Sequence, residues 1–318
     1  MHRAATTIAF SLVLAGLFGL APARLRAQPA ADNPVAAPKA SDRAEMQVMP
    51  IPSHGARLNA LVYVAAGAGP HPAVVLLHGF PGYERNLDLA QDMRRAGWDV
   101  LYFDYRGSWG TPGDFSFSHG IEDTAAVLAY LRQPGVAREL RLDPDRIVLI
   151  GHSMGGFMAV EAAAGDPAIK AFATISAVDL GGRMQSLRAT QGGHEAIARA
   201  SAALGGQSMA PLAGCTPEGL ARELLRHAAG WSFQAKADAL KDRRVLVVTS
   251  DDGMAAENDA FVAALRKAGD TRVSTAHLPT DHVYSDQRLE LSKTVLAWLA
   301  GLPDAPGTAG RAAPQRGR

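Results

Sequence analysis

The chain has 318 residues, of which 47% are hydrophobic, and this is enough to bury one large core. Lysine and arginine total 32 against 31 aspartates and glutamates, so the net charge is close to zero. Arginines are concentrated at both ends, which leaves the body of the chain slightly acidic. This balance gives no electrostatic basis for nucleic-acid binding, and we expect no nucleic acid as a partner.

The first 27 residues have the pattern of a secretory signal peptide. Arg3 lies in a short basic start, residues 8–20 are apolar and uncharged, and two candidate cleavage sites end at Ala23 and Ala27. The apolar run is short for a bilayer span, so an uncleaved membrane anchor is the weaker alternative. We therefore expect a periplasmic or secreted protein with no stable membrane anchor after cleavage.

Cys215 is the only cysteine in the sequence. An exported chain with one cysteine forms no internal disulfide, and Cys215 lacks cysteine partners for a zinc site. The acids Asp251, Asp252 and Glu257 lie close together in the sequence, but their spacing matches no calcium-binding loop. We expect neither a metal nor an organic cofactor, and we assign Cys215 no catalytic role.

Strand and helix patterns alternate along the body, after an Ala- and Pro-rich linker over residues 28–44. The run 73–77 is continuously apolar, as in strands that are buried on both faces of a parallel sheet. This alternation predicts a single α/β domain over 45–303 with a mostly parallel sheet. Strands are predicted over 46–51, 58–65, 72–78, 99–105, 146–150, 171–178, 244–249 and 272–278, and helices over 86–96, 121–132, 154–164, 256–268 and 285–299.

The block 181–240 shows no strand pattern and is too long for a connecting loop, so we expect it to carry helices of its own. A helical lid inserted over the sheet is the natural interpretation. Some of its apolar side chains are candidates for lining an acyl pocket, and packing of the lid onto the body is an equal alternative for them. These side chains are Met184, Met209, Leu212 and Trp231. The tail 304–318 is rich in Pro, Gly, Ala and Arg and is expected to be disordered.

Ser153 is the candidate nucleophile. It stands at the centre of Gly151-His152-Ser153-Met154-Gly155, directly after the predicted strand 146–150 and directly before the predicted helix 154–164. This strand–turn–helix context is what the nucleophile elbow of a serine hydrolase requires. Glycines flank the serine because side chains there would clash with neighbouring backbone. The N-terminus of the following helix is expected to stabilise developing negative charge.

The oxyanion of an acyl-transfer reaction needs preorganised N–H donors. One candidate is the backbone N–H of Met154, the residue after the serine. The other is Phe80 in the loop His78-Gly79-Phe80-Pro81-Gly82, since Pro81 has no N–H to donate. His78 is better explained as a buried histidine that is hydrogen-bonded within this loop than as a second catalytic histidine.

His282 is the candidate general base. It follows the predicted strand 272–278 and precedes the last helix, so that a loop at the carboxyl edge of the sheet can carry it to the serine. His277 lies within that strand and is expected to point into the packing. The remaining histidines after the serine, His194 and His227, fall within the lid block.

The triad acid should accept the N–H of the histidine and stabilise its cationic form. Asp251 and Asp252 both follow the predicted strand 244–249, and the choice between them is open, with Asp252 preferred. The other carboxylate is a candidate cap for the following helix. Asp179, after the preceding strand, is an outside candidate. Arg106 could bind a substrate carboxylate, but a structural role in bracing loops is favoured.

Taken in chain order, these motifs resemble those of the α/β-hydrolase superfamily over roughly residues 50–300. They are His78-Gly79-x-Pro81-Gly82, Phe103-Asp104-Tyr105-Arg106-Gly107, Gly151-x-Ser153-x-Gly155-Gly156, Asp252 and His282. The resemblance implies an eight-stranded, mostly parallel sheet flanked by helices, with a lid after the sixth strand. Residues 142–147 are similar to members related to prolyl-oligopeptidase and dienelactone hydrolases. The acid turn departs from the family's frequent Gly-x-x-Asp, since it has the sequence Ser250-Asp251-Asp252-Gly253.

These residues predict an acyl-enzyme mechanism that acts on a small ester or amide substrate. The first expectation is an exported carboxylesterase with Ser153, His282 and Asp252 as its triad. One alternative is a serine peptidase or aminopeptidase that acts on short peptides or amides. The other is a non-catalytic binding protein on the same fold. The sequence leaves the physiological substrate and the oligomeric state open.

Overall fold

The computed structural model describes residues 42–303 and 305–306. The predicted signal peptide, most of the predicted linker and most of the predicted tail lie outside these residues. Ala305, which belongs to the predicted tail, is described and is buried against the core. Within the described part of the chain, no helix has the length and apolar character needed to cross a membrane.

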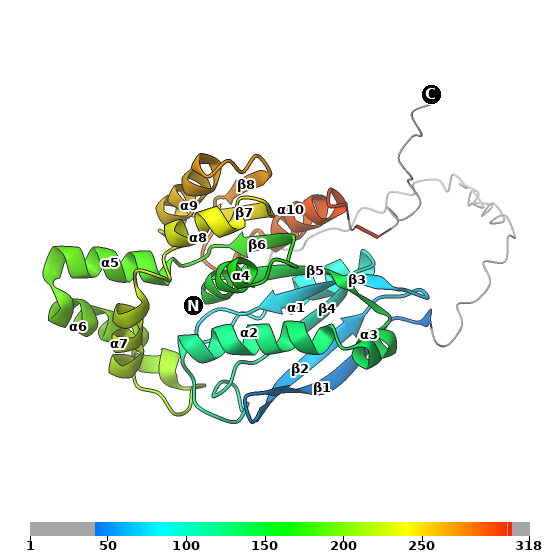
Figure 1. The fold of residues 1–318 in the computed structure, drawn as a ribbon, viewed down its shortest axis with the longest axis horizontal. Helices are drawn as coiled ribbons and strands as arrows, with labels where there is room; N and C mark the ends of the chain where they lie inside the picture. Colours follow the sequence, from blue (N-terminus) through cyan, green and yellow to red (C-terminus); the bar gives the residue numbers. More distant parts are fainter. Residues whose placement is uncertain (1–41, 304, 307–318) are drawn as a thin grey trace, which may run out of the picture. The chain divides into compact units, whose positions relative to one another are not determined.

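Eight strands form one sheet in the order β1-β2-β4-β3-β5-β6-β7-β8 (Figure 1). β1 pairs antiparallel with β2, and β2 pairs antiparallel with β4, whereas all the other neighbouring pairs are parallel. The predicted eight-stranded, mostly parallel sheet is thereby confirmed. The strands are β1 (Glu45–Ser53), β2 (Ala56–Val64), β3 (His71–Leu77), β4 (Asp99–Phe103), β5 (Leu142–His152), β6 (Ala171–Ile175), β7 (Arg244–Ser250) and β8 (Val273–Leu278).

Helices cover both faces of the sheet. Successive residues of a strand point to opposite faces, so a strand with apolar residues throughout is buried on both sides. In β3, Val75 belongs to the hydrophobic cluster that contains α2, α4, α8 and α9, whereas Val74 and Leu76 belong to the cluster that contains α1 and α10. The sequence did not predict α3, a seven-residue helix with Pro134 at its start. The helices are α1 (Leu87–Arg95), α2 (Phe117–Leu131), α3 (Pro134–Leu140), α4 (Met154–Gly165), α8 (Phe233–Leu240), α9 (Ala255–Lys267) and α10 (Arg288–Ala300).

The block between β6 and β7 is helical, as expected. It holds α5 (Leu180–Gln191), α6 (Gly193–Leu204), the short 3₁₀ helix η2 (Gly206–Met209), α7 (Pro217–His227) and α8. Figure 1 shows α5, α6 and α7 grouped together at one end of the molecule. The last helix of the block, α8, packs against α4 and α9 and so belongs to the helical layer of the body.

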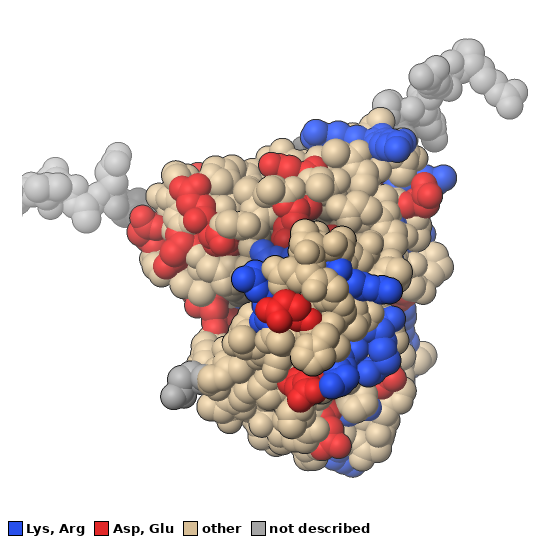
Figure 2. Space-filling view, turned by 90° about the vertical axis from the view of Figure 1, so that its left-hand side faces the viewer, with Lys and Arg blue, Asp and Glu red and all other residues tan. Residues whose placement is uncertain are grey.

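The face that α5, α6 and α7 present carries charges of both signs. Figure 2 shows acidic and basic side chains on this side of the molecule, separated by uncharged surface. One glutamate of α7 is used internally, since the Glu223 carboxylate accepts hydrogen bonds from the N–H groups of Phe117 and Ser118 at the start of α2. The grouped helices are thus fastened to the body of the domain.

The parallel strands place four loops at one edge of the sheet. β3, β5, β7 and β8 run in the same direction, so the segments that follow them leave the sheet at the carboxyl ends. These segments hold the Phe80 loop, Ser153, the two aspartates Asp251 and Asp252, and His282. The topology therefore brings the predicted site residues to the same edge of the sheet.

Candidate active site

Ser153 lies in a strained turn between β5 and α4. Its backbone angles are φ 55° and ψ −120°, which a side-chain-bearing residue adopts only at a cost of roughly 1–3 kcal/mol. Its N–H donates to the Ile175 carbonyl oxygen at 2.9 Å, which fixes the turn against β6. Strain of this kind persists only where the surrounding structure enforces it, and it is typical of functional sites.

The flanking glycines are required by close backbone packing. A Cβ atom on Gly151 would lie 2.0 Å from the Gly155 carbonyl oxygen, and one on Gly155 would lie 2.0 Å from the Leu77 carbonyl oxygen. Both distances are far inside van der Waals contact, and backbone atoms cannot move aside cheaply. This clash is the physical reason for the Gly-x-Ser-x-Gly pattern in this chain.

His282 lies in the loop between β8 and α10 and contacts Asp252. Its Nδ1 is 2.7 Å from Asp252 Oδ2, so Nδ1–H donates to the carboxylate and Nε2 is left free of it. The Met254 N–H also donates to Asp252, at 2.9 Å. Burial works to raise the pKa of Asp252, but the hydrogen bonds from His282 and Met254 outweigh it, and the pKa lies below its usual value. Asp252 is thus held as a carboxylate.

The other candidate acids have different partners. Asp251 Oδ1 lies 3.2 Å from His277 Nε2, and the two side chains are 65% and 49% exposed. His277 therefore points to solvent and not into the packing as expected, because β8 is an edge strand in which only Leu278 is buried. Asp179 caps α5 by accepting from the Gly182 N–H at 2.8 Å, and it also accepts from the Phe233 N–H.

Ser153 and His282 line the same cavity, which has a volume of about 480 Å³. Phe80 and Met154 also line it, so the four predicted residues of nucleophile, base and oxyanion site share one space. The remaining lining comes mainly from α5, α6 and α7 and is largely apolar. It consists of Phe117, Val178, Leu180, Arg183, Met184, Leu187, Arg199, Ala200, Ala203, Leu204, Leu224 and Met254.

Of the four apolar side chains proposed for an acyl pocket, Met184 lines this cavity. Trp231 packs instead, since its ring stacks on His227 at 4.4 Å and meets the Phe157 ring edge-on at 5.5 Å. Met209 and Leu212 pack against the core cluster without lining the cavity. One of the four side chains therefore lines the cavity, and the other three pack.

The loop after β3 packs directly against the nucleophile turn. A Cβ atom on Gly79 would lie 3.0 Å from Ser153 Cβ, so a glycine allows the loop to approach. In the part of the chain that the structure describes, the N–H groups of Phe80 and Met154 make no hydrogen bond. Both are therefore open to an acceptor in the cavity that they line.

His78 and Arg106 have the structural surroundings favoured for them. His78 is buried, its Nδ1 lies 2.8 Å from the Gly79 carbonyl oxygen, and burial lowers its pKa to about 4. The Arg106 guanidinium is buried against Asp123, with Nε 2.6 Å from Oδ1, and it also pairs with Glu122. Neither residue lines the cavity of Ser153.

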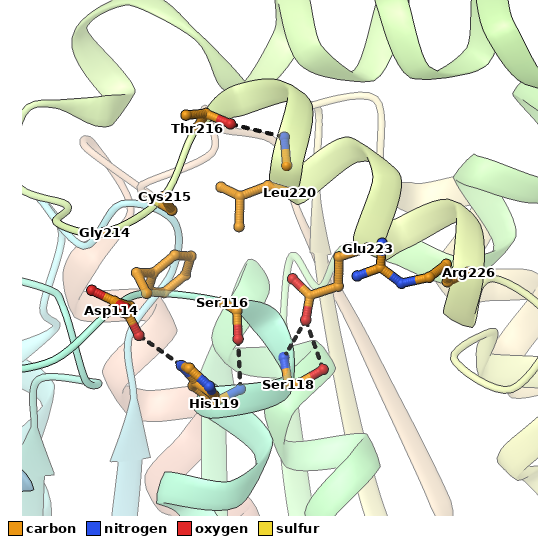
Figure 3. A pocket seen from close by; sticks show the side chains of 12 residues that line it. Asp114, Ser116, Ser118, His119, Gly214, Cys215, Thr216, Leu220, Glu223 and Arg226 are labelled. Carbon is orange, nitrogen blue, oxygen red and sulfur yellow. Dashed lines mark hydrogen bonds between the residues drawn. The ribbon is translucent and has the colours of Figure 1, made fainter.

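A second, larger hollow of about 650 Å³ lies between the start of α2 and α7 (Figure 3). Two of its polar side chains are engaged with the protein, since Glu223 accepts from Ser118 and Thr216 accepts from the Gly219 N–H. Cys215 lines this hollow, and burial raises the pKa of its thiol, which disfavours a reactive thiolate. The hollow contains none of the predicted catalytic residues.

Residues 42–303 and 305–306 contain no cluster of three or more His, Cys, Asp or Glu side chains that could hold a metal ion. Glu257, which was considered beside Asp251 and Asp252, accepts instead from Arg183 Nε at 2.6 Å and from the Asp179 N–H at 3.1 Å. Each of the three acids thus has its own protein partner.

Four residues near the site escaped the sequence analysis. His152 occupies the variable position of the glycine–serine motif, and its ring lies 4.7 Å from the ring of His282. Ser176 Oγ lies 3.0 Å from Ser250 Oγ and 2.9 Å from the Tyr284 hydroxyl, and all three are buried next to Asp252. No motif marks these positions, because the contacts join segments far apart in the sequence.

The chain is similar to known proteins in sequence. The model of the alpha/beta hydrolase family matches residues 74–293. An uncharacterized protein of Mycobacterium tuberculosis is 34% identical over 108 residues, which are 33% of this chain and 36% of that protein. The chain thus spans only about a third of the length of that relative.

Solved structures share the fold at low identity. A carboxyl esterase from Bacillus coagulans is 16% identical with a TM-score of 0.61, over 80% of this chain and 98% of that one. Est1E from Butyrivibrio proteoclasticus is 20% identical with a TM-score of 0.58, over 79% and 97%. Acylaminoacyl peptidase from Pyrococcus horikoshii is 20% identical with a TM-score of 0.57, over 80% and 41%. At these identities, the likeness shows the fold alone.

Proposed function

Since the chain belongs to the alpha/beta hydrolase family, we propose that it is a serine hydrolase that cleaves esters of apolar acyl groups. The observation that carries the proposal is the shared cavity of Ser153 and His282, with Asp252 hydrogen-bonded to His282 on the side away from the free Nε2. The strained backbone at Ser153 adds support. The same geometry favours Asp252 over Asp251 as the acid of the triad.

The proposed reaction proceeds through an acyl-enzyme. His282 Nε2 takes the proton of Ser153 as Oγ attacks the ester carbonyl, and Asp252 stabilises the resulting imidazolium. The N–H groups of Phe80 and Met154 bind the oxyanion, each contributing roughly 3 kcal/mol to transition-state stabilisation. The imidazolium then protonates the leaving alcohol. Water, activated by the same histidine, releases the acid and restores the serine.

The cavity supports an apolar acyl group as the part of the substrate that is held. Its volume of about 480 Å³ is in the range of small-molecule sites. Apart from the catalytic Ser153 and His282, its walls are aliphatic and aromatic except at Arg183 and Arg199. Met184 and Leu187 on α5, with Leu204 on α6, form much of the wall. We therefore assign α5, α6 and α7 the role of a lid that selects the acyl chain.

An amidase or peptidase is the second candidate. Its support is the fold likeness to an acylaminoacyl peptidase, together with the similarity of residues 142–147 noted in the sequence. A non-catalytic binding protein is the third candidate, and it is disfavoured because a serine, a histidine and a carboxylate all lie at usable positions. The substrate in each case is a small molecule or a short peptide.

The test uses p-nitrophenyl esters of increasing acyl length on the protein that starts at residue 28. We expect hydrolysis by the wild type, and its loss in Ser153→Ala and His282→Ala. Ser274→Ala, an exposed serine on β8, is the matched control and should be unaffected. Activity that survives in Ser153→Ala would refute the nucleophile. Hydrolysis of aminoacyl amides in preference to esters would favour the peptidase, and a failure of a phosphonate probe to label the wild type would favour the binding protein.

Export is a separate part of the proposal. The pattern of residues 1–27 supports it. Expression of the full chain in a Gram-negative host, followed by fractionation, should give a periplasmic product whose mass corresponds to cleavage after Ala23 or Ala27. An uncleaved chain in the membrane fraction would support the anchor instead.

A further inference from the structure

His152, the residue directly before Ser153, contacts the main chain of His282. It is the last residue of β5, and only 3% of its surface is exposed. Its Nε2 lies 2.8 Å from the carbonyl oxygen of His282. A carbonyl oxygen can only accept, so Nε2 carries the proton and His152 is the donor.

We propose that His152 is a positioning residue that holds the main chain of His282 in place, an inference that rests on the proposed function of His282 as the base. Asp252 holds the imidazole ring of His282 through Nδ1, and His152 holds the backbone from which that ring projects. Two anchors, one on the ring and one on the main chain, fix the direction in which Nε2 of His282 points.

The backbone of His282 has little other support. Among the described residues, the hydrogen bond from His152 is the only one that the main chain of His282 makes. The neighbours of His282 are held separately, since Arg288 donates to the Val283 carbonyl oxygen at 3.0 Å and the Tyr284 N–H donates to the Asp281 carbonyl oxygen at 3.1 Å. A displacement of about 1 Å at a catalytic group can lower the rate by roughly 100-fold.

The other ring nitrogen of His152, Nδ1, also supports a positioning role. Nδ1 of His152 is buried and has no hydrogen-bond partner among the described residues. Such orphaned polar atoms are rare in protein interiors and call for a reason. For stability alone an apolar side chain would serve better here, whereas the hydrogen bond to His282 requires a donor at the position of Nε2.

The charge state of His152 is compatible with this role. Burial, reinforced by the nearby charges of His282 and Arg288, lowers the pKa of His152 to about 4, against the smaller opposing effects of its hydrogen bond to the His282 carbonyl and of Asp252. His152 is therefore neutral at neutral pH. It adds no positive charge beside His282 when that ring becomes cationic during the proposed reaction, although the ring centres are only 4.7 Å apart.

The test compares His152→Gln with His152→Met. The two side chains have similar length and flexibility, but only glutamine places an N–H donor near the position of Nε2. We expect His152→Met to lower kcat by about tenfold or more with little change in KM, and to slow phosphonate labelling of Ser153 by a similar factor. His152→Gln should retain kcat within about threefold of the wild type.

His71 provides the matched control. Its Nε2 also contacts a backbone carbonyl oxygen, that of Gly67 at 3.2 Å, but it lies at the start of β3, away from the site. His71→Met should leave kcat within about twofold of the wild type, whatever it does to the melting temperature.

Equal losses in His152→Gln and His152→Met would overturn the proposal, as would wild-type kcat in His152→Met. NMR of the ring nitrogens of the wild type gives an answer that needs no variant to fold. An Nε2–H tautomer for His152 is expected, and an Nδ1–H tautomer would overturn the proposal. A wild type that neither hydrolyses esters or amides nor reacts with the phosphonate would instead refute the proposed function.

Discussion

Asp99 offers a test of the fold that is independent of the active site. This carboxyl lies at the start of β4 with no exposed surface. One oxygen accepts from the Ala65 N–H at 2.8 Å, whereas the other has no hydrogen-bond partner in the described chain. Burial raises its pKa to about 7, against the smaller effects of that hydrogen bond and of Arg141. The charged form is therefore the one that folding disfavours.

The sign of the pH dependence follows from this pKa. The pKa of Asp99 is about 7 in the folded state and about 3.9 in the unfolded state. At pH values between the two, the carboxyl is protonated in the folded state and ionised in the unfolded state. The contribution of Asp99 to stability is fully present below the unfolded pKa, and it is lost as the pH rises through about 7. At about 1.4 kcal/mol per pKa unit, the loss between pH 5 and pH 8 is about 2–3 kcal/mol.

Asp99→Asn removes the titration while keeping an oxygen for the Ala65 N–H. The free energy of unfolding is measured with urea at pH 5 and at pH 8. The variant-minus-wild-type difference in this free energy should be about 2–3 kcal/mol more favourable to the variant at pH 8 than at pH 5. Any constant cost of burying the amide cancels in this difference. Asp238→Asn, on the exposed side of α8, is the control and should show no such gain. A variant-minus-wild-type difference that is the same at both pH values would refute the reasoning.

Three further predictions concern the site. Asp252→Asn is expected to lower kcat for ester hydrolysis by roughly 10³–10⁴-fold, because an amide cannot stabilise a cationic His282. Asp251→Asn should change kcat by less than about twofold, and equal losses in the two variants would contradict the assignment of Asp252. Met184→Trp should shift the preferred p-nitrophenyl ester to a shorter acyl chain by filling the cavity, and an unchanged length profile would count against an acyl site there. Gly155→Ala should prevent folding or lower the melting temperature steeply, because the new methyl group would lie 2.0 Å from the Leu77 carbonyl oxygen. A wild-type melting temperature in this variant would contradict the prediction and show that the turn can adapt.

The sequence predicted the parts of the fold that depend on local pattern. All eight predicted strands are present, and a continuous apolar run such as 73–77 marks a strand that is buried on both faces. The helix α3 was missed, since seven residues give too little periodicity to detect. β6 ends earlier than predicted, at Ile175, because Ser176 has a φ of 44° and leaves the strand conformation.

The choice between Asp251 and Asp252 shows where local pattern stops being informative. The two carboxylates are neighbours in a bend directly after β7. The Asp251 N–H donates to the Thr280 carbonyl oxygen at 3.0 Å, just beyond the last paired residues of β7 and β8. Beyond this bond, the Asp251 side chain contacts His277 and the Asp252 side chain contacts His282. These histidines lie 26 and 30 positions away in the sequence, so the sequence alone leaves both acids open.

The loop that carries His282 owes its position to strands that are not its neighbours in the sequence. β8 lies at the edge of the sheet, three strands from β5, yet the loop after it contacts the ends of β7, β6 and β5. Thr280 meets Asp251 after β7, Tyr284 meets Ser176 after β6, and His282 meets His152 at the end of β5. These contacts bring the imidazole back across the sheet to Ser153. Because each one depends on the strand order, the motif around Ser153 can predict a base but cannot show that His152 holds it.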